Sequence, residues 1–107
     1  EWLGPILDTQ AIVLCGDFNL PPGTAPYRLA ADRLHDVASN GSEALHTFIS
    51  TRPFARIDHI FVSPHFTTES VSVIRNYLTR VSSDHLPLLA DLHVESLALK
   101  DEVARMI

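Results

Sequence analysis

Three short polar motifs, each beside an apolar run, carry the residues best suited to chemistry in this chain. They are Cys15–Asn19 (CGDFN) after the run 11–14, Arg56–His59 (RIDH) before 60–62, and Ser82–Pro87 (SSDHLP) before 88–92. Each motif supplies a carboxylate next to an amide or an imidazole. Such groups, brought together at the rim of a sheet, are those needed for metal-assisted attack on a phosphate.

In this order and at these spacings, the motifs resemble the endonuclease/exonuclease/phosphatase superfamily of DNase I-like nucleases, inositol polyphosphate phosphatases and neutral sphingomyelinases. The resemblance covers roughly Ala11 to Val94. It implies an α+β fold, a two-sheet β-sandwich with flanking helices, in which each half of the chain contributes about one sheet. The family's metal-binding glutamate, an upstream asparagine and a further histidine or tyrosine lie in its N-terminal half, and none of those motifs is present here. We therefore expect residues 1–107 to be a single domain or fragment, the C-terminal half of such a domain.

The resemblance also implies a role for each site residue. Asp17 would position or deprotonate the attacking water, while Asn19 would orient that water and help stabilise the pentavalent phosphate. Asp58 would accept a hydrogen bond from His85, which fixes the tautomer of the imidazole and raises its basicity. His85 would then donate to a non-bridging phosphate oxygen. Asp84 would bind a metal or order its water, with Asp17 and Asn19 as the other ligands.

The residues themselves favour a hard divalent cation at this site. Oxygen donors suit Mg²⁺, or Mn²⁺ or Ca²⁺, whereas no zinc-like spacing such as His-x-x-x-His occurs. The other histidines are therefore expected to be structural: His35, His46, His65 and His93. Cys15 is expected to be a buried structural thiol, because it ends an apolar run.

Strand alternation predicts where the motif side chains point. Asp17 and Asn19 would share one face of a strand, with Phe18 pointing into the fold. His59 would face away from Asp58 as a packed histidine, and a phosphate contact from Arg56 is the less favoured interpretation. The alternative for these motifs is structural, since Asp and Asn also cap loops.

The remaining pattern is mostly that of strands. Strands are expected at 11–15, buried on both faces, and at 45–49, 57–62, 70–78 and 88–94. Helices are expected at the end of 2–7, at 26–34 with Thr24 as a cap, and in the tail 95–107. Asn40-Gly41 predicts a turn. Thr47-Phe48 is expected to pack beneath the site.

Composition limits the class of protein. A chain of 107 residues is one domain at most, and a hydrophobic fraction of 46% is enough for a core. The net charge of -5, with 8 basic residues, disfavours nucleic acid as the partner, because phosphate neutralisation supplies most non-specific affinity. We expect a soluble chain without a membrane-spanning run, of undetermined localisation. The start at Glu1 shows no targeting segment and indicates a chain that begins inside something larger.

Three hypotheses for the function remain. The leading one is part of a metal-dependent phosphodiesterase or phosphatase acting on a phosphate ester, inactive alone without the glutamate ligand. The second is a DNA or RNA nuclease of the same fold, and the third is a non-catalytic binding module. A sheet without its facing layer would also expose apolar side chains and favour self-association or pairing with the missing half. Those side chains are Ile12, Leu14, Ile60, Val62 and Leu89.

Overall fold

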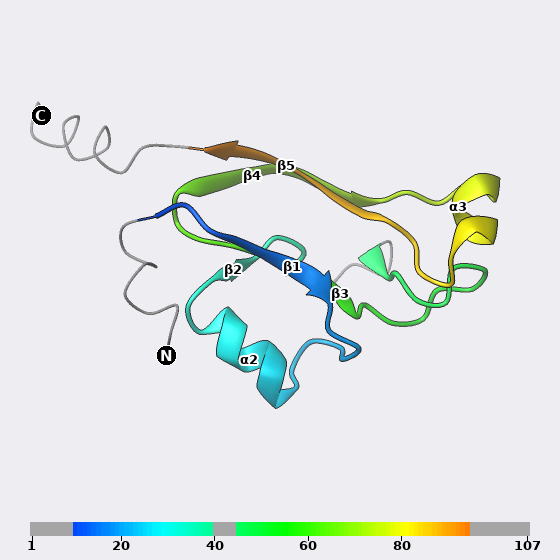
Figure 1. The fold of residues 1–107 in the computed structure, drawn as a ribbon, viewed down its shortest axis with the longest axis horizontal. Coiled ribbons are helices and arrows are strands. Elements are labelled where there is room, and N and C mark those ends of the chain that lie inside the picture. Colours follow the sequence, from blue (N-terminus) through cyan, green and yellow to red (C-terminus); the bar gives the residue numbers. More distant parts are fainter. Residues whose placement is uncertain (1–9, 40–44, 95–107) are drawn as a thin grey trace, which may run out of the picture.

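The computed structural model describes residues 10–39 and 45–94. Its elements are β1 (Val13–Asp17), α2 (Ala25–Ala31), β2 (His35–Asp36), β3 (Asp58–Val62), β4 (Phe66–Val73), α3 (Tyr77–Ser82) and β5 (Leu88–Val94). The described strands form two antiparallel sheets, one in the order β1-β3-β2 and one of β4-β5. In Figure 1 the β4–β5 sheet lies above β1 and β3, and α2 lies below them. The expected α+β class, with two sheets and outer helices, is confirmed.

The hydrophobic core lies between α2 and the three-stranded sheet. β1 and β3 pair antiparallel, with Leu14 opposite Phe61, so alternation sends both side chains to the α2 face. There Phe61 and Leu34 are buried, and Tyr27 and Ala30 of α2 pack against them. The opposite face of β3 carries Asp58, one of the predicted site residues.

Helix α2 begins where expected and ends earlier. Thr24 occupies the N-cap position and a proline lies in the first turn, as the sequence predicts. The Thr24 hydroxyl, however, donates to the Pro21 carbonyl at 3.2 Å and makes no cap hydrogen bond. The helix ends at Ala31, three residues before the predicted limit of residue 34, because the chain then turns into β2.

The strand predicted over 70–78 is wrong at its C-terminal end. β4 ends at Val73, and Asn76 instead caps α3. The Asn76 side chain accepts from the Thr79 N–H, and the Thr79 hydroxyl accepts from the Asn76 N–H, each at 2.9 Å. This reciprocal capping box ends the strand pattern. The final strand matches its prediction at 88–94, whereas 45–49 makes only isolated bridges, from Phe48 to Ala55 and His85.

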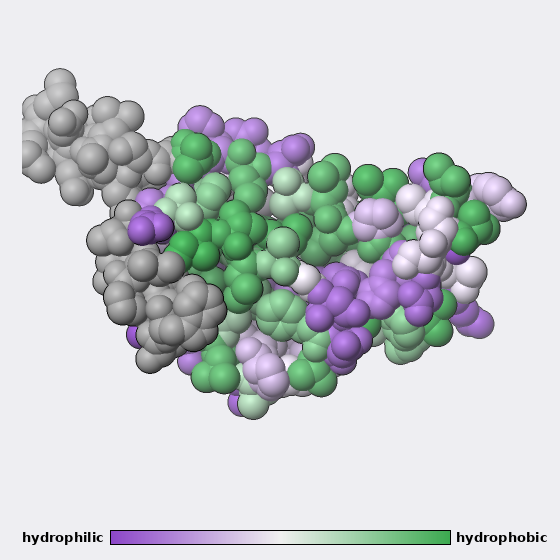
Figure 2. Space-filling view, in the orientation of Figure 1, coloured by the Kyte–Doolittle hydropathy of each residue, from purple (hydrophilic) through white to green (hydrophobic). Residues whose placement is uncertain are grey.

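One burial prediction is wrong and another holds only in part, and the sheet arrangement explains both. Among the described strands, β1 lies at a sheet edge and pairs only with β3, so Val13 is 45% exposed and Cys15 is exposed and not buried. The described strands also belong to two sheets and not to one. Of the apolar side chains expected to lack a facing layer, Leu89 is 48% exposed, whereas Val62 is buried at 1% and Ile12, Leu14 and Ile60 are half-buried. Figure 2 shows hydrophobic residues gathered over β1 and the β4–β5 sheet, beside a hydrophilic area where β1 ends.

Three predicted features lie outside the described residues: the helix end at 2–7, the turn at Asn40-Gly41 and the helix at 95–107. Across the described ranges, no helix has the length and apolar character needed to cross a membrane.

Candidate active site

The side chains of Asp58 and His85 meet at the site, although 27 positions separate them in the sequence. Asp58 begins β3, and His85 lies in the loop between α3 and β5. The His85 Nδ1 lies 2.7 Å from Oδ2 of Asp58, the contact expected from the motifs. Because an ionised carboxylate only accepts hydrogen bonds, Nδ1–H of His85 is the donor. The other ring nitrogen, Nε2, is left facing the end of β1.

Asp17 is the last residue of β1 and lies opposite Asp58 in the ladder. Its Oδ2 is 3.6 Å from Nε2 of His85, and its Oδ1 accepts the N–H of Asn19 at 2.8 Å. One carboxylate therefore both faces the imidazole and holds the turn that follows it. Asp17 therefore caps a turn, as the structural alternative for this motif predicts, and also faces the imidazole of the site.

Asn19 does not reach the site by strand alternation. β1 ends at Asp17, and Asn19 has a φ of 56°, in the left-handed region that asparagine tolerates better than most residues. The interpretation of Asp17 and Asn19 as alternate residues of one strand is wrong. The hydrogen bond to Asp17 instead closes a turn that places the backbone N–H of Asn19 beside the Asp17 carboxylate.

Three carboxylates surround the His85 imidazole. Oδ1 of Asp84 lies 4.0 Å from Nε2, on a side chain that is 73% exposed, and Asp17 and Asp58 are closer. The hydrogen bond that His85 donates to Asp58 is the main cause that raises the pKa of His85 above its usual value, against the opposing effect of burial. The negative charges of Asp58, Asp17 and Asp84 raise this pKa further. The site therefore favours the imidazolium form, a cationic donor suited to a phosphate oxygen.

The loop around Phe48 holds His85 in place. The Phe48 and His85 rings lie with centroids 5.2 Å apart, and their backbones form a bridge. The Leu86 N–H donates to the carbonyl of Thr47 at 2.7 Å, and the His85 N–H donates to the Ser83 hydroxyl at 3.1 Å. Thr47 is fully buried. The predicted packing of Thr47 and Phe48 beneath the site is confirmed.

An open pocket of about 280 Å³ lies between β1, β3 and the start of β5. Asp17 and Asp58 line it together with Cys15 and the apolar segment Leu86–Leu88. Gly16 lies at this wall with a φ of 155°, which glycine adopts far more readily than other residues. The two carboxylates thus open onto a cavity that is apolar on its other side.

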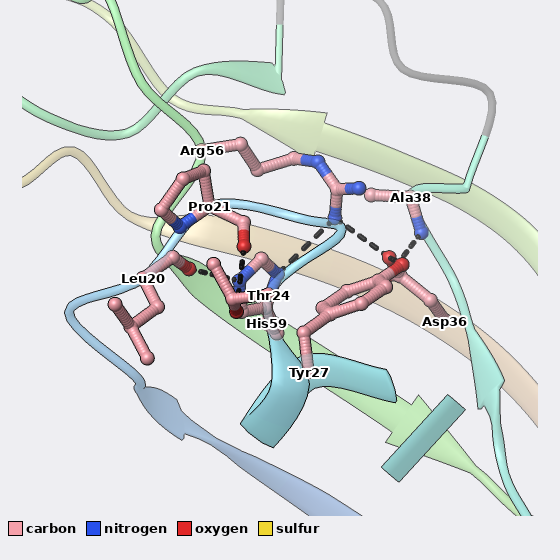
Figure 3. A network of polar contacts seen from close by, with 8 residues as sticks. All are labelled: Leu20, Pro21, Thr24, Tyr27, Asp36, Ala38, Arg56 and His59. Atoms are coloured by element: carbon pink, nitrogen blue, oxygen red, sulfur yellow. Dashed lines mark hydrogen bonds and ion pairs between the residues drawn. The ribbon is translucent and has the colours of Figure 1, made fainter. Parts of the chain in front are cut away.

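The opposite face of β3 carries a buried polar network, drawn in Figure 3. His59 is 1% exposed, which confirms it as a packed histidine. Arg56 is 5% exposed and its Nη1 lies 2.8 Å from Oδ2 of Asp36, so the phosphate contact considered for Arg56 is wrong. Asp36 also accepts the Tyr27 hydroxyl at 2.5 Å and the Ala38 N–H at 3.0 Å.

Sequence reasoning missed Asp36 and the polar role of Tyr27. A buried arginine needs a carboxylate partner, but no spacing in the sequence identifies which carboxylate that is. Burial alone would raise the pKa of Asp36, yet the hydrogen bonds from Tyr27, Ala38 and Arg56 outweigh it and hold that pKa below its usual value. Burial and then the Asp36 hydrogen bond raise the pKa of Tyr27, so its hydroxyl remains a donor.

The donors at the site fit a hard cation. Within the described ranges, Asp17, Asp58 and His85 offer ligand atoms that all lie within 4.8 Å of one another. Asp58 and His85 are engaged with each other, however, so Asp17 is the more available donor of this group. Asp84, expected as a ligand, lies outside the group, with its Oδ1 4.0 Å from Nε2 of His85. Exposed carboxylate oxygens suit Mg²⁺, Mn²⁺ or Ca²⁺.

Solved structures share this fold. The endonuclease/exonuclease/phosphatase from Bacteroides vulgatus is 26% identical with a TM-score of 0.71, over 85% of this chain and 39% of that one. The same kind of protein from Beutenbergia cavernae DSM 12333 is 25% identical with a TM-score of 0.57, over 88% and 30%. A functionally unknown conserved protein from Enterococcus faecalis V583 is 23% identical with a TM-score of 0.72, over 88% and 42%, and shows the fold alone.

The chain thus spans less than half the length of each of these three solved structures. A comparison with curated proteins found no match. The sequence model of the Endonuclease/Exonuclease/phosphatase family matches residues 2–85, a range that contains the three polar motifs up to His85. On this match and on the shared fold, the chain belongs to the Endonuclease/Exonuclease/phosphatase family.

Proposed function

We propose that this chain carries part of the active site of a metal-dependent hydrolase that cleaves a phosphodiester or phosphomonoester. The single observation that supports this most strongly is the cluster at the end of β1: Asp58 bonded to His85 at 2.7 Å, with Asp17 3.6 Å from the opposite ring nitrogen. Family membership supports the same class of reaction.

In the proposed reaction, His85 acts as a cationic donor. Asp58 holds Nδ1–H, so Nε2–H points toward the site and can donate to a non-bridging phosphate oxygen as negative charge develops there. Asp58 also orients the ring, and the surrounding carboxylates favour its protonated form. This arrangement is pre-organised, since Phe48 and Ser83 hold the loop that carries His85.

Asp17 and Asn19 act on the water in this proposal. Asp17 accepts a proton from the attacking water or positions it, and Asn19 orients the water and contacts the phosphate. Their connection through the Asn19 N–H supports this pairing, since it fixes the two residues relative to each other. Asp17 and Asp84, with Asn19, would hold a divalent cation, which supplies charge neutralisation at the phosphate.

The acidic balance favours a phosphatase or small phosphodiesterase over a nuclease. The net charge of -5 leaves little basic surface on residues 1–107 for a nucleic acid backbone.

The test is hydrolysis of p-nitrophenyl phosphate and bis(p-nitrophenyl) phosphate by the full-length protein. We expect turnover that requires Mg²⁺ or Mn²⁺, is lost with EDTA and returns when the metal is restored. His85→Ala should lower kcat by about 10²–10³-fold, the effect of removing a transition-state donor. His93→Ala is the matched control, an exposed histidine of β5 outside the cluster. Turnover that survives both EDTA and His85→Ala would contradict the proposal.

We also propose that the apolar surface of this chain pairs with a partner. Several large apolar side chains are exposed, among them Val13 of β1, Leu89 and Val94 of β5, and Tyr77, Leu78 and Val81 of α3. The chain matches only 30% to 42% of the three solved structures, which supports additional chain of the same domain as the partner. When residues 1–107 are studied alone, we expect this surface to pair with a second copy of the chain instead.

A further inference from the structure

His59 contacts both residues that flank Asn19. The edge of the Phe18 ring meets the His59 ring at 86° with centroids 5.1 Å apart, and His59 Nε2 lies 2.9 Å from the carbonyl oxygen of Leu20. Tyr27 packs on the same ring, also at 5.1 Å. A single buried side chain, His59, therefore contacts the turn on both sides of Asn19, which has a left-handed conformation.

Arg56 decides which nitrogen of His59 carries the proton. Its Nη1 lies 3.2 Å from His59 Nδ1, and a guanidinium can only donate. Nδ1 must therefore accept, and the proton must sit on Nε2, where it donates to the Leu20 carbonyl. Asp36 in turn fixes the guanidinium at 2.8 Å (Figure 3). The chain Asp36–Arg56–His59–Leu20 is thus a directed series of hydrogen bonds with one tautomer of His59.

β3 thereby serves the site from both of its faces. Asp58 holds His85 on one face, and the next residue, His59, holds the Phe18–Leu20 turn on the other. We propose that His59, fixed by Arg56 as its Nε2–H tautomer, is a positioning residue that keeps Asn19 and the Asp17 carboxylate correctly placed beside His85. This inference rests on the proposed function, and it assigns no contact between His59 and substrate.

Two substitutions separate the hydrogen bonds of His59 from its packing. His59→Phe keeps a ring between Phe18 and Tyr27 but removes both hydrogen bonds. His59→Gln offers one acceptor and one donor, so it can restore the series from Arg56 to Leu20. The matched control is His65→Phe, because His65 is also a buried histidine, 6% exposed, whose Nδ1 lies 2.9 Å from the Ser63 hydroxyl away from the site.

The experiment uses the full-length protein with two independent readouts. The first is the NMR amide signal of Asn19, which reports its hydrogen bond to Asp17, together with ¹H–¹⁵N correlations that identify the protonated nitrogen of His59. The second is kcat and KM for bis(p-nitrophenyl) phosphate with Mg²⁺. We expect His59→Phe to shift the NMR signal of the Asn19 amide. The same substitution should lower kcat by about 10- to 100-fold at unchanged KM, as for other residues that orient a catalytic group.

His59→Gln should recover most of both readouts, and His65→Phe should leave both unchanged. A folded His59→Phe protein with the wild-type Asn19 amide and kcat would overturn the inference, as would His65→Phe giving the same loss. Should His59→Phe not fold, the ¹H–¹⁵N correlations of the wild type still test the inference, because a proton on Nδ1 of His59 would overturn it. A wild-type protein without hydrolase activity would refute the proposed function instead, while the amide comparison would still decide the positioning role.

Discussion

The imidazole Nδ1 of His85 and the carboxylate of Asp58 are 2.7 Å apart, on segments separated by 27 positions. This pair couples the ionisation of the imidazole to a neighbouring negative charge. We expect an NMR titration of the metal-free protein to give His85 a pKa above its ordinary value of 6.5. Asp58→Asn should bring that pKa back toward the ordinary value, because it removes the main cause of the rise.

The sign of the effect on stability follows from this direction. Because the pKa of His85 is higher in the folded state, its contribution to stability is complete below pH 6.5 and is lost as the pH rises through the folded-state pKa. Urea unfolding at several pH values should show this loss in the wild type and a smaller one in Asp58→Asn. A His85 pKa unaffected by Asp58→Asn would contradict the assignment.

The carboxylate of Asp84 should affect the metal requirement more than the chemistry. Asp84→Asn removes an exposed charge 4.0 Å from the His85 ring nitrogen without disturbing buried packing. We expect the Mg²⁺ concentration for half-maximal hydrolysis to rise about 10-fold or more, because the loss of a carboxylate charge weakens metal binding. Asp32→Asn is the control, since Asp32 is an exposed carboxylate at the end of α2. Equal metal dependence of the two variants would exclude Asp84 as a ligand.

Breaking the buried Arg56–Asp36 pair should destabilise the fold. Asp36→Asn leaves the guanidinium buried without its counter-charge, which costs about 3–5 kcal/mol in free energy of unfolding. The wild-type pKa of Asp36 is lowered, so its stabilisation is complete above pH 3.8 and disappears as the pH falls through the folded-state pKa. Urea unfolding of Asp36→Asn should lack this acid-dependent part. A loss of stability equal to that of the exposed control Asp91→Asn would show that the pair contributes little.

The capping box of α3 should be worth about 1 kcal/mol. Asn76→Ala removes the acceptor for the Thr79 N–H, while Asn76→Ser retains one. We expect urea unfolding to show the loss for alanine and only a few tenths of it for serine. Equal loss in both variants would indicate that the cap contributes through something other than its hydrogen bond.

Residues 1–107 expressed alone should associate. The exposed apolar side chains of β1, β5 and α3 remain uncovered in the single chain, and apolar surface costs roughly 25 cal/mol per Å² in water. Light scattering at micromolar concentration should give a mass above that of the 11.9 kDa monomer. Val13→Lys should shift the mass toward the monomer, whereas Thr67→Lys, at an exposed polar position, should not. A stable monomer of the wild type would contradict the pairing proposal.

The sequence alone determined most of the local structure around the site. The apolar runs beside Asp17 and Asp58 form paired strands, and the run after His85 forms β5 over its predicted range. These predictions succeed because strand alternation is a property of neighbouring residues. The same local rule failed at Asn19, where the strand had already ended, and at Asn76, where a side-chain cap outweighed strand propensity.

Only the tertiary structure decided which distant groups meet. Nothing in the sequence spacing pairs Arg56 with Asp36, or gives His59 the carbonyl of Leu20, because these partners are chosen by how β3 packs against α2 and β2. Burial likewise depends on the neighbouring layer, and so Cys15 at the end of an apolar run proved exposed on an edge strand. Local sequence determines where a strand forms and how its side chains alternate, whereas the whole fold determines which partner a buried polar group meets.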